Sequence, residues 1–220
     1  MLAHDLITEE IPPLKLSDSG KKALRWMDEF KVWHLPVVKN SEFIGLISES
    51  DLIDNSSSES TIGKIKPNYI TVFASENQHI FEVVKMVSEI RLSVIAVLDA
   101  DKKYIGSISI HQLMRAIAAM PVVNEPGGII TLEINTHDYS LSEIARIIES
   151  NDAQILGTFI TSHPDSTKME VTVKINKGDL SAIRQTFERF KYHITASFQQ
   201  NEHHDTLKNR YDALMKYLNV

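Results

Sequence analysis

The chain has 220 residues, of which 43% are hydrophobic, and 23 Lys and Arg oppose 29 Asp and Glu for a formal net charge of −6. This length and composition predict a soluble globular protein with one large domain or two smaller ones. Neither half of the sequence carries the basic stripe that nucleic-acid binding needs, so we expect no nucleic-acid partner.

No apolar run approaches the roughly 18 residues of a membrane-spanning helix, so we expect no membrane partner. The stretch MLAHDLITEE also lacks the basic and then apolar layout of a signal peptide. The sequence therefore predicts a cytoplasmic protein. The absence of cysteine fits that location, and it excludes thiolate nucleophiles and sulfur-ligated zinc.

The first half of the sequence contains an internal repeat. The aligned pairs are ITEEIPPL at 7–14 with IKPNYITV at 65–72, ALRWM at 23–27 with VVKMV at 83–87, HLPVV at 34–38 with VIAVL at 94–98, and GLISESDL at 45–52 with GSISIHQL at 106–113. Because the order of features is the same in both stretches, we expect two copies of one module.

Each copy predicts the same elements in the same order. A short extended segment leads to a helix, at 23–30 or 83–90, with apolar residues at helical spacing. Two strands joined by a polar turn follow as a hairpin, and a second helix comes next. The polar stretch DNSSSES at 54–60 links the two copies.

A different pattern begins after PGG at 126–128 and predicts the order β-α-β-β-α-β of a ferredoxin-like domain. The predicted strands are 129–135, 153–161, 169–175 and 193–198, and the predicted helices are 140–150, capped by Ser140, and 179–190, capped by Asp179. A last helix is predicted from the apolar face formed by Leu207, Tyr211, Leu214 and Leu218.

The repeat closely resembles a tandem pair of CBS domains, also called a Bateman module. The domain after it resembles an ACT-type regulatory domain, and the order of the two is similar to that in bacterial proteins of the acetoin-utilisation regulator type. We therefore expect an α/β (α+β) fold with CBS domains at 1–58 and 59–122, an ACT-like domain at 126–200 and a C-terminal helix at 201–220.

The resemblance to CBS pairs implies two clefts for an adenine nucleotide or S-adenosylmethionine, with no required cofactor and no metal. In the first cleft Gly45 lets the backbone approach a ligand, and Ser48 offers a hydroxyl at a helix start. About one turn on, Asp51 brings a carboxylate that accepts both hydroxyls of a ribose. The positions that the resemblance implies are Ile7, Thr8, His34, Leu35, Pro36, Gly45, Ser48 and Asp51.

The second cleft departs from this pattern, so we expect a weaker site there. Gln112 replaces the acid, and a neutral amide lacks the charge-assisted acceptance of a carboxylate. Lys66 stands at the position aligned with Thr8, where it favours an anion. The second-cleft positions are Lys66, Val94, Ser109 and Gln112.

Each candidate has a structural alternative. Ser48 and Asp51 are both good residues for the start of a helix, where they act as caps. His34 on an apolar strand also fits a half-buried sheet position. The pair His203 and His204 reads as a polar entry to the last helix rather than as a metal site.

In the ACT-like domain, the turn NTHDYSLSE carries Tyr139 and Ser140 where Pro-Gly is typical of the family. A bulky tyrosine there argues against the usual amino-acid site. We expect this domain to serve mainly in assembly.

No nucleophile elbow, phosphate-binding loop or HExxH motif is present, so we expect no enzyme. The first hypothesis is a regulatory protein that senses an adenosyl ligand through the CBS pair and relays occupancy to the ACT-like domain or to an unknown protein partner. The alternative is a structural module that binds no small molecule and acts by docking a partner. In both cases a symmetric homodimer is expected.

Overall fold

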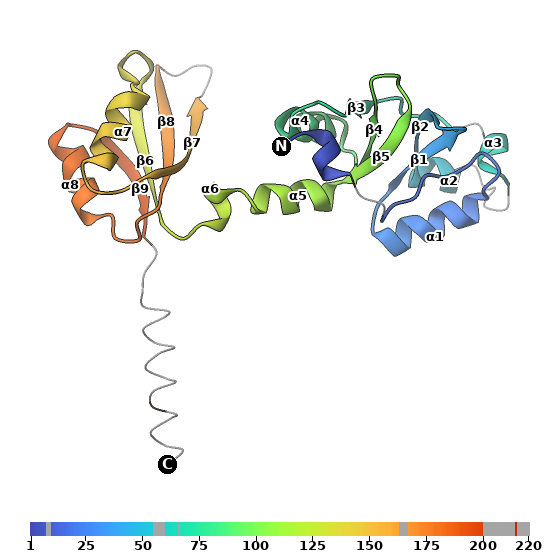
Figure 1. Cartoon of the computed structure of the whole chain (residues 1–220), viewed down its shortest axis with the longest axis horizontal. Helices are drawn as coiled ribbons and strands as arrows, with labels where there is room; N and C mark the ends of the chain where they lie inside the picture. Colours follow the sequence, from blue (N-terminus) through green and yellow to red (C-terminus); the bar gives the residue numbers. More distant parts are fainter. Residues whose placement is uncertain (8–9, 55–59, 66, 163–166, 200–213, 215–220) are drawn as a thin grey trace. The chain divides into compact units, whose positions relative to one another are not determined.

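The computed structural model describes the chain except for residues 8–9, 55–59, 66, 163–166, 200–213 and 215–220 (Figure 1). The chain divides into two units, Met1–Ala118 and Ala119–Val220. Of the predicted helix at 201–220, only Leu214 lies inside the described residues, and its side chain is exposed. Among the described residues, no helix is long and apolar enough to cross a bilayer.

The first unit contains the two predicted copies, and each has the predicted helix, hairpin and second helix. The first copy consists of η1 (Ala3–Leu6), α1 (Gly20–Phe30), β1 (His34–Lys39), β2 (Glu42–Ser48) and α2 (Glu49–Asp54). The second consists of α3 (Ile62–Ile65), β3 (Phe73–Ser75), α4 (Ile80–Ile90), β4 (Val94–Leu98), β5 (Tyr104–Ser109) and α5 (Ile110–Ala118).

The hairpin prediction is confirmed in both copies. Strands β1 and β2 pair antiparallel, as do β4 and β5, and each pair has one register shift, at Val37/Val38 or Val97/Leu98. Asn40 and Ser41, which join β1 to β2, both have positive φ. A type I′ turn requires this conformation, which matches the twist of the strands that it joins.

The first short helix of each copy is hydrogen-bonded to the other copy. The amide of Ala3 in η1 donates to Gln78 O at 2.9 Å, just before α4. The amide of Ile62 in α3 donates to Asp18 O at 2.8 Å, just before α1. The two copies therefore exchange their opening segments.

This exchange shows which residues correspond at the start of each copy. Because Ala3 and Ile62 make the equivalent contact, they correspond to one another. At Ala3 and Ile62 the two copies are therefore offset by 59 residues, one more than in the predicted match of Ile7 with Ile65. Ile65 lies at the end of α3 and is buried in the core of the first copy.

Two glycines allow the exchanged segments to approach closely. A Cβ on Gly45 would lie 2.7 Å from Tyr69 Cβ of the second copy. A Cβ on Gly106 would overlap Ile7 Cγ2 of the first copy. Next to Gly45, Leu46 and Ile70 exchange two backbone hydrogen bonds of 2.8 and 3.0 Å.

The second unit has the predicted order β-α-β-β-α-β, preceded by a short helix that was not predicted. Its elements are α6 (Pro121–Asn124), β6 (Gly128–Asn135), η2 (Thr136–Asp138), α7 (Leu141–Glu149), β7 (Ile155–Ser162), β8 (Lys168–Ile175), α8 (Ser181–Arg189) and β9 (His193–Phe198). All neighbouring strands are antiparallel, in the order β7-β8-β6-β9.

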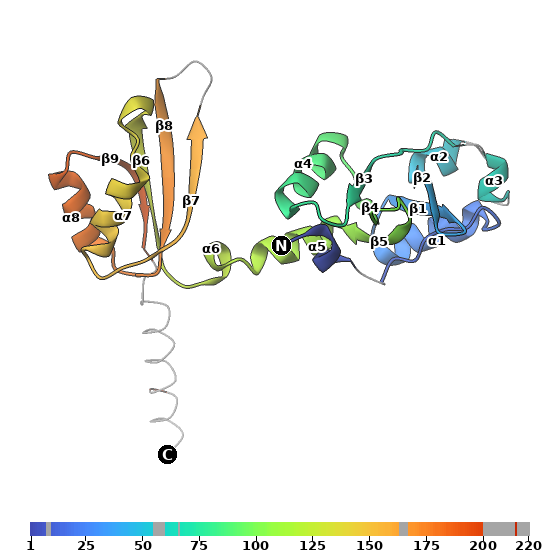
Figure 2. The same ribbon diagram turned by 45° about the horizontal axis from the view of Figure 1, so that its top comes forward.

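Helices α7 and α8 lie on the same side of this sheet in both views (Figures 1 and 2). Ile144 and Ile147 of α7 and Phe187 of α8 form one buried cluster with side chains of the sheet. The predicted cap at Ser140 is present, since its Oγ accepts from the amide of Glu143. The predicted cap at Asp179 is wrong, because α8 begins at Ser181 with Leu180 at the N-cap position; Asp179 lies one residue earlier, and its Oδ1 accepts from the amide of Ser181. One face of the sheet and both helices thus share a core.

We expect Gly45→Ala to lower the free energy of unfolding of the first unit by about 1–3 kcal/mol, because the new methyl group must displace Tyr69. Both tryptophans of the chain, Trp26 and Trp33, lie in this unit, so tryptophan fluorescence during urea denaturation reports its unfolding. The exposed Lys21→Ala serves as control, with a change within about 0.5 kcal/mol. Equal unfolding midpoints for Gly45→Ala and the parent would contradict the proposed close contact.

Candidate functional site

Ser48 and Asp51 form a reciprocal cap at the start of α2. Ser48 Oγ accepts from the amide of Asp51 at 3.2 Å, and Asp51 Oδ2 accepts from the amide of Ser48 at 3.2 Å. The hydroxyl of Ser48 also donates to Asp51 Oδ2 at 2.6 Å. This is the capping-box geometry, in which two backbone donors at a helix start are satisfied together. The capping role named as the structural alternative is therefore present.

The second copy builds the same cap with an amide in place of the acid. Gln112 Oε1 accepts from the amide of Ser109 at 3.0 Å, and Ser109 Oγ accepts from the amide of Gln112 at 3.3 Å. A neutral side chain therefore also accepts from the backbone amide at this turn, although its contact with the serine hydroxyl is longer, at 3.4 Å against 2.6 Å. The negative charge of Asp51 is not required by the cap.

His34 lies at the start of β1 with only 7% of its surface exposed. Its Nδ1 accepts from the amide of Ser93 at 3.2 Å, and Ser93 Oγ accepts from the amide of His34 at 3.0 Å. Because Ser93 belongs to the second copy, His34 joins the two copies. The half-buried sheet position anticipated for it is in fact a buried one.

Burial lowers the pKa of His34 below 6.5, and the negative charge of Asp51 opposes that shift in part. His34 therefore tends toward the neutral form, with Nδ1 as acceptor and the proton on Nε2. His34 is also paired with Ser48 across the hairpin. The structure thus brings His34, Ser48 and Asp51 together, as the sequence predicts.

Residues of the second copy that the sequence analysis did not predict lie beside the first hairpin. Tyr69 packs over Gly45, and Ile70 pairs with Leu46. Ser93 completes the contact with His34. Nothing in the local sequence marks these residues, because their role arises from the exchange of segments between the copies.

Other candidates lie elsewhere. Ile7 lies against Gly106 of the second copy, whereas Asp51 lies in the first copy. Gly45 is buried, and its missing side chain makes room for Tyr69. Leu35 is a fully buried core residue of the first copy, and Pro36 is buried, with its carbonyl accepting from the amide of Leu14.

In the second cleft, Val94 is fully buried and Ser109 is nearly so, whereas Gln112 is partly exposed. Val94 packs in the core cluster of the first copy. It is therefore a core residue. The remaining candidates, Thr8 and Lys66, lie outside the described residues.

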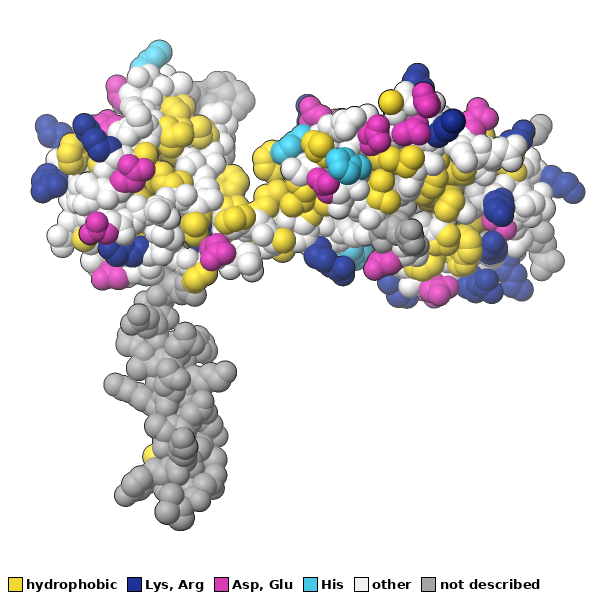
Figure 3. Space-filling view, in the orientation of Figure 1, with side chains coloured by type: hydrophobic (Ala, Val, Ile, Leu, Met, Phe, Trp, Pro, Cys, Tyr) yellow, Lys and Arg dark blue, Asp and Glu magenta, His cyan; other side chains and the backbone are white. Residues whose placement is uncertain are grey.

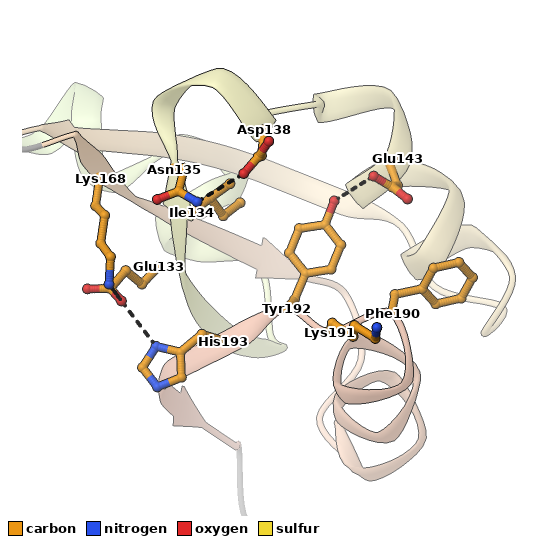
Figure 4. A pocket seen from close by; sticks show the side chains of 10 residues that line it. All are labelled: Glu133, Ile134, Asn135, Asp138, Glu143, Lys168, Phe190, Lys191, Tyr192 and His193. Atoms are coloured by element: carbon orange, nitrogen blue, oxygen red, sulfur yellow. Dashed lines mark hydrogen bonds and ion pairs between the residues drawn. The ribbon is translucent and has the colours of Figure 1, made fainter.

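The second unit has a cavity of about 350 Å³ at the turn after β6 (Figure 4). Tyr192 points to Glu143 and donates to its Oε2 at 2.9 Å. Burial and this carboxylate raise the pKa of Tyr192 to about 12. Opposite them, Glu133 pairs with Lys168 at 2.7 Å and with His193 at 3.4 Å, and the Lys168 bond lowers the pKa of Glu133.

Tyr139, the residue that the sequence placed at this turn, packs against the core of the unit instead of marking the cavity. Most polar side chains that line the cavity are hydrogen-bonded or ion-paired with one another. In the part of the chain that the structure describes, no three His, Cys, Asp or Glu side chains are grouped to hold a metal ion.

The buried His34 predicts a pH dependence of stability. Its folded pKa lies below the value near 6.5 of the unfolded chain, so the unfolded state takes up a proton that the folded state resists. We expect the stability of the first unit to fall as the pH drops below about 6.5, until the folded pKa is reached. Urea denaturation followed by tryptophan fluorescence measures this slope.

The matched variant is His34→Val, because Val94 occupies the equivalent position opposite Ser109 in the second copy. All other histidines are the same in parent and variant, so the difference in slope isolates His34. Equal slopes for the two proteins would show that His34 does not resist protonation.

Comparison with known proteins identifies the first unit. The model of the CBS domain family matches residues 3–58 and 63–119, together just over half of the chain. Similar solved structures include a CBS domain pair/ACT domain protein from Thermotoga maritima, with 20% identity, a TM-score of 0.48, and coverage of 53% of this chain and 96% of that one.

Two further solved structures contain adenosyl compounds. One is CBSX2 in complex with AMP, with 23% identity, a TM-score of 0.45, and coverage of 53% of this chain and 95% of that one. The other is a CBS domain pair in complex with 5′-methylthioadenosine and S-adenosyl-L-methionine, with 20% identity, a TM-score of 0.44, and coverage of 54% and 96%. On the family match, the chain belongs to the CBS domain family.

Proposed function

We propose that the chain is a non-catalytic regulatory protein of the cytoplasm whose CBS pair binds an adenosyl ligand beside Asp51. The observation that carries this proposal is the pair of equivalent caps. Asp51 and Gln112 do the same structural work, so the negative charge at Asp51 serves something other than the cap. A carboxylate is the group that accepts two neighbouring hydroxyls, as a ribose presents them.

The surroundings of Asp51 support this role. Ser48 holds the carboxylate at the end of β2, and the buried His34 lies within its electrostatic reach. Tyr69 and Ile70 bring the second copy to the same strand. A ligand here would touch both copies, so its binding can favour one arrangement of the pair.

The proposed site is unequal to its counterpart. The second cleft carries Gln112, whose amide accepts a hydroxyl without charge assistance. We infer that the cleft at Asp51 binds first and more tightly. The candidate ligands are AMP, ATP and S-adenosylmethionine, and no cofactor is required.

We further propose that the second unit is an ACT-type domain and that ligand occupancy is relayed to it or to a protein partner. Its β-α-β-β-α-β order and its strand order support this reading. The size of any such signal is limited by the difference in ligand affinity between the two arrangements.

The glutamine of the second cap suggests a variant that tests the role of Asp51. Asp51→Gln keeps the cap that Gln112 makes in the second copy but removes the charge. We expect the affinity for AMP, ATP or S-adenosylmethionine to fall by about 10-fold or more, as the loss of a charge-assisted bond predicts. Isothermal titration calorimetry measures the affinity, and unchanged thermal unfolding without ligand serves as the folding control.

The reverse variant, Gln112→Asp, is the matched partner and is expected to strengthen the second cleft. Equal affinity of Asp51→Gln and the parent would contradict the ribose role of Asp51. If the parent itself binds none of the three compounds, the module that acts without a small molecule becomes the better account.

We also propose that the first unit forms a homodimer through an apolar groove of about 310 Å³ between α4 and α5. Its walls include Val84, Val87, Leu113, Met114, Ile117 and Trp33. Met114 is 59% exposed and Trp33 is 47% exposed. Apolar side chains reach the surface over α5 (Figure 3), as expected of a surface that a partner covers.

Met114→Glu is expected to weaken this association, because it would bury an unpaired charge in the interface. Sedimentation equilibrium measures the change, which we expect to be about 10-fold or more in the dissociation constant. Ile105→Glu, at an exposed apolar residue of β5 outside the groove, is the control. An equal effect of the two variants would exclude this groove as the interface.

A further inference from the structure

The sheet of the second unit has one face that α7 and α8 do not cover (Figure 2). Side chains alternate between the two faces along each strand. In β6, Ile130 and Leu132 are fully buried in the core shared with the helices, whereas Thr131 between them is half-buried and points to the other side. We call the side of Thr131 the open face.

Strand register arranges the open face in rows that cross all four strands. One complete row carries no charge and consists of Phe159, Thr172, Thr131 and Ala196. The next row toward the end of β9 contains Ile129 and Phe198. Its charged member, Lys174, turns its ammonium to the backbone and donates to Gly127 O at 3.1 Å. These two rows therefore form an uncharged surface across the sheet.

This surface is open to solvent at two opposite corners. Phe159 of β7 is 51% exposed, and Phe198 of β9 is 63% exposed. The short helix α6 covers a third corner, where Val122 lies over Gly157. Two exposed phenylalanines on one sheet face are typical of a surface that another part of a protein covers.

The chain leaves the sheet at the edge of this surface, because β9 ends at Phe198. In the sequence that follows, residues 205–218 predict a helix with an apolar face formed by Leu207, Tyr211, Leu214 and Leu218. Of these four, Leu214 lies inside the described residues, and it is 54% exposed. The segment thus offers an apolar face that needs a partner.

The two surfaces have matching lengths. In a helix, the apolar face from Leu207 to Leu218 is about 16 Å long. A row across four strands is about 14 Å long, since neighbouring strands are about 4.8 Å apart. Residues 199–204 reach about 20 Å when extended, so they can bring the helix over any part of the open face.

We propose that the segment 205–218 docks as an amphipathic helix on the open face of its own sheet, with its apolar face against these two rows. A segment tethered at Phe198 is present at an effective concentration of the order of millimolar. A second copy of the chain at ordinary concentration therefore competes poorly for the same face. This contact is independent of the proposed adenosyl site and of the groove between α4 and α5.

Charge at the border of the surface also favours this segment. On the other side of the uncharged row lies Glu170, which is exposed and has no ion pair with another described residue. In the predicted helix, Lys208 and Arg210 flank opposite sides of the apolar face. A basic side chain therefore faces Glu170 whichever way the helix crosses the sheet.

The chain has no cysteine, so Lys216→Cys gives the full chain a single site for a nitroxide label, on the polar side of the predicted helix. Backbone amide signals in the NMR spectrum lose intensity near the nitroxide. We expect Phe159, Thr131 and Thr172 to lose most of their intensity relative to the reduced label. Arg184, exposed on α8 on the opposite side of the sheet, is expected to lose much less.

Two pairs of matched variants in the labelled chain test each side of the contact. Leu214→Asp places a charge on the apolar face of the segment, and Asn209→Asp places the same charge on its polar side. Ala196→Glu places a charge on the open face, and Ala182→Glu places one on the exposed surface of α8. The first member of each pair is expected to restore most of the lost intensity, and the second to leave the loss unchanged.

The proposal is wrong if the open face keeps its intensity in the labelled parent, or if Leu214→Asp and Asn209→Asp behave alike. Unchanged positions of the remaining amide signals show that each variant folds. A mixture of isotopically labelled chain and unlabelled chain carrying the nitroxide reports contacts between copies. An equal loss of intensity in that mixture would assign the segment to a second copy and contradict docking on its own sheet.

Discussion

The close contact between the two copies is the constraint on which the first unit depends. The opening segment of each copy is hydrogen-bonded to the other copy, and Ala3 and Ile62 make the equivalent backbone bonds. Gly45 and Gly106 permit this because a side chain at either position would occupy the place of Tyr69 or Ile7. Neither copy is complete by itself, so a ligand bound beside one hairpin would contact residues of both.

Several residues of the candidate site have a structural role. Ser48 and Asp51 complete a helix cap, and Ser109 with Gln112 completes the same cap without a charge. Ser93 uses its hydroxyl and amide to hold His34 in a buried position. The cap in the second copy shows that the two backbone bonds of this turn form without a carboxylate.

Sequence patterns predicted the elements that repeat over many residues. The hairpins, the long helices and the β-α-β-β-α-β order follow from apolar periodicity and turn residues. The four-residue elements η1, α3 and α6 were missed, because one turn of helix shows no periodicity. The contact of Gly45 was not predicted for a related reason, since its neighbour Tyr69 is distant in sequence and no local signal marks the contact.

The most direct test of the central claim is to titrate AMP into the isotopically labelled chain and follow the backbone amide signals by NMR. The account predicts that the first signals to shift belong to Ser48 and Asp51 together with Tyr69 and Ile70, while Ile7 and Gly106 respond only at higher concentration. Equal responses at the two clefts, or none at Asp51, would contradict the account.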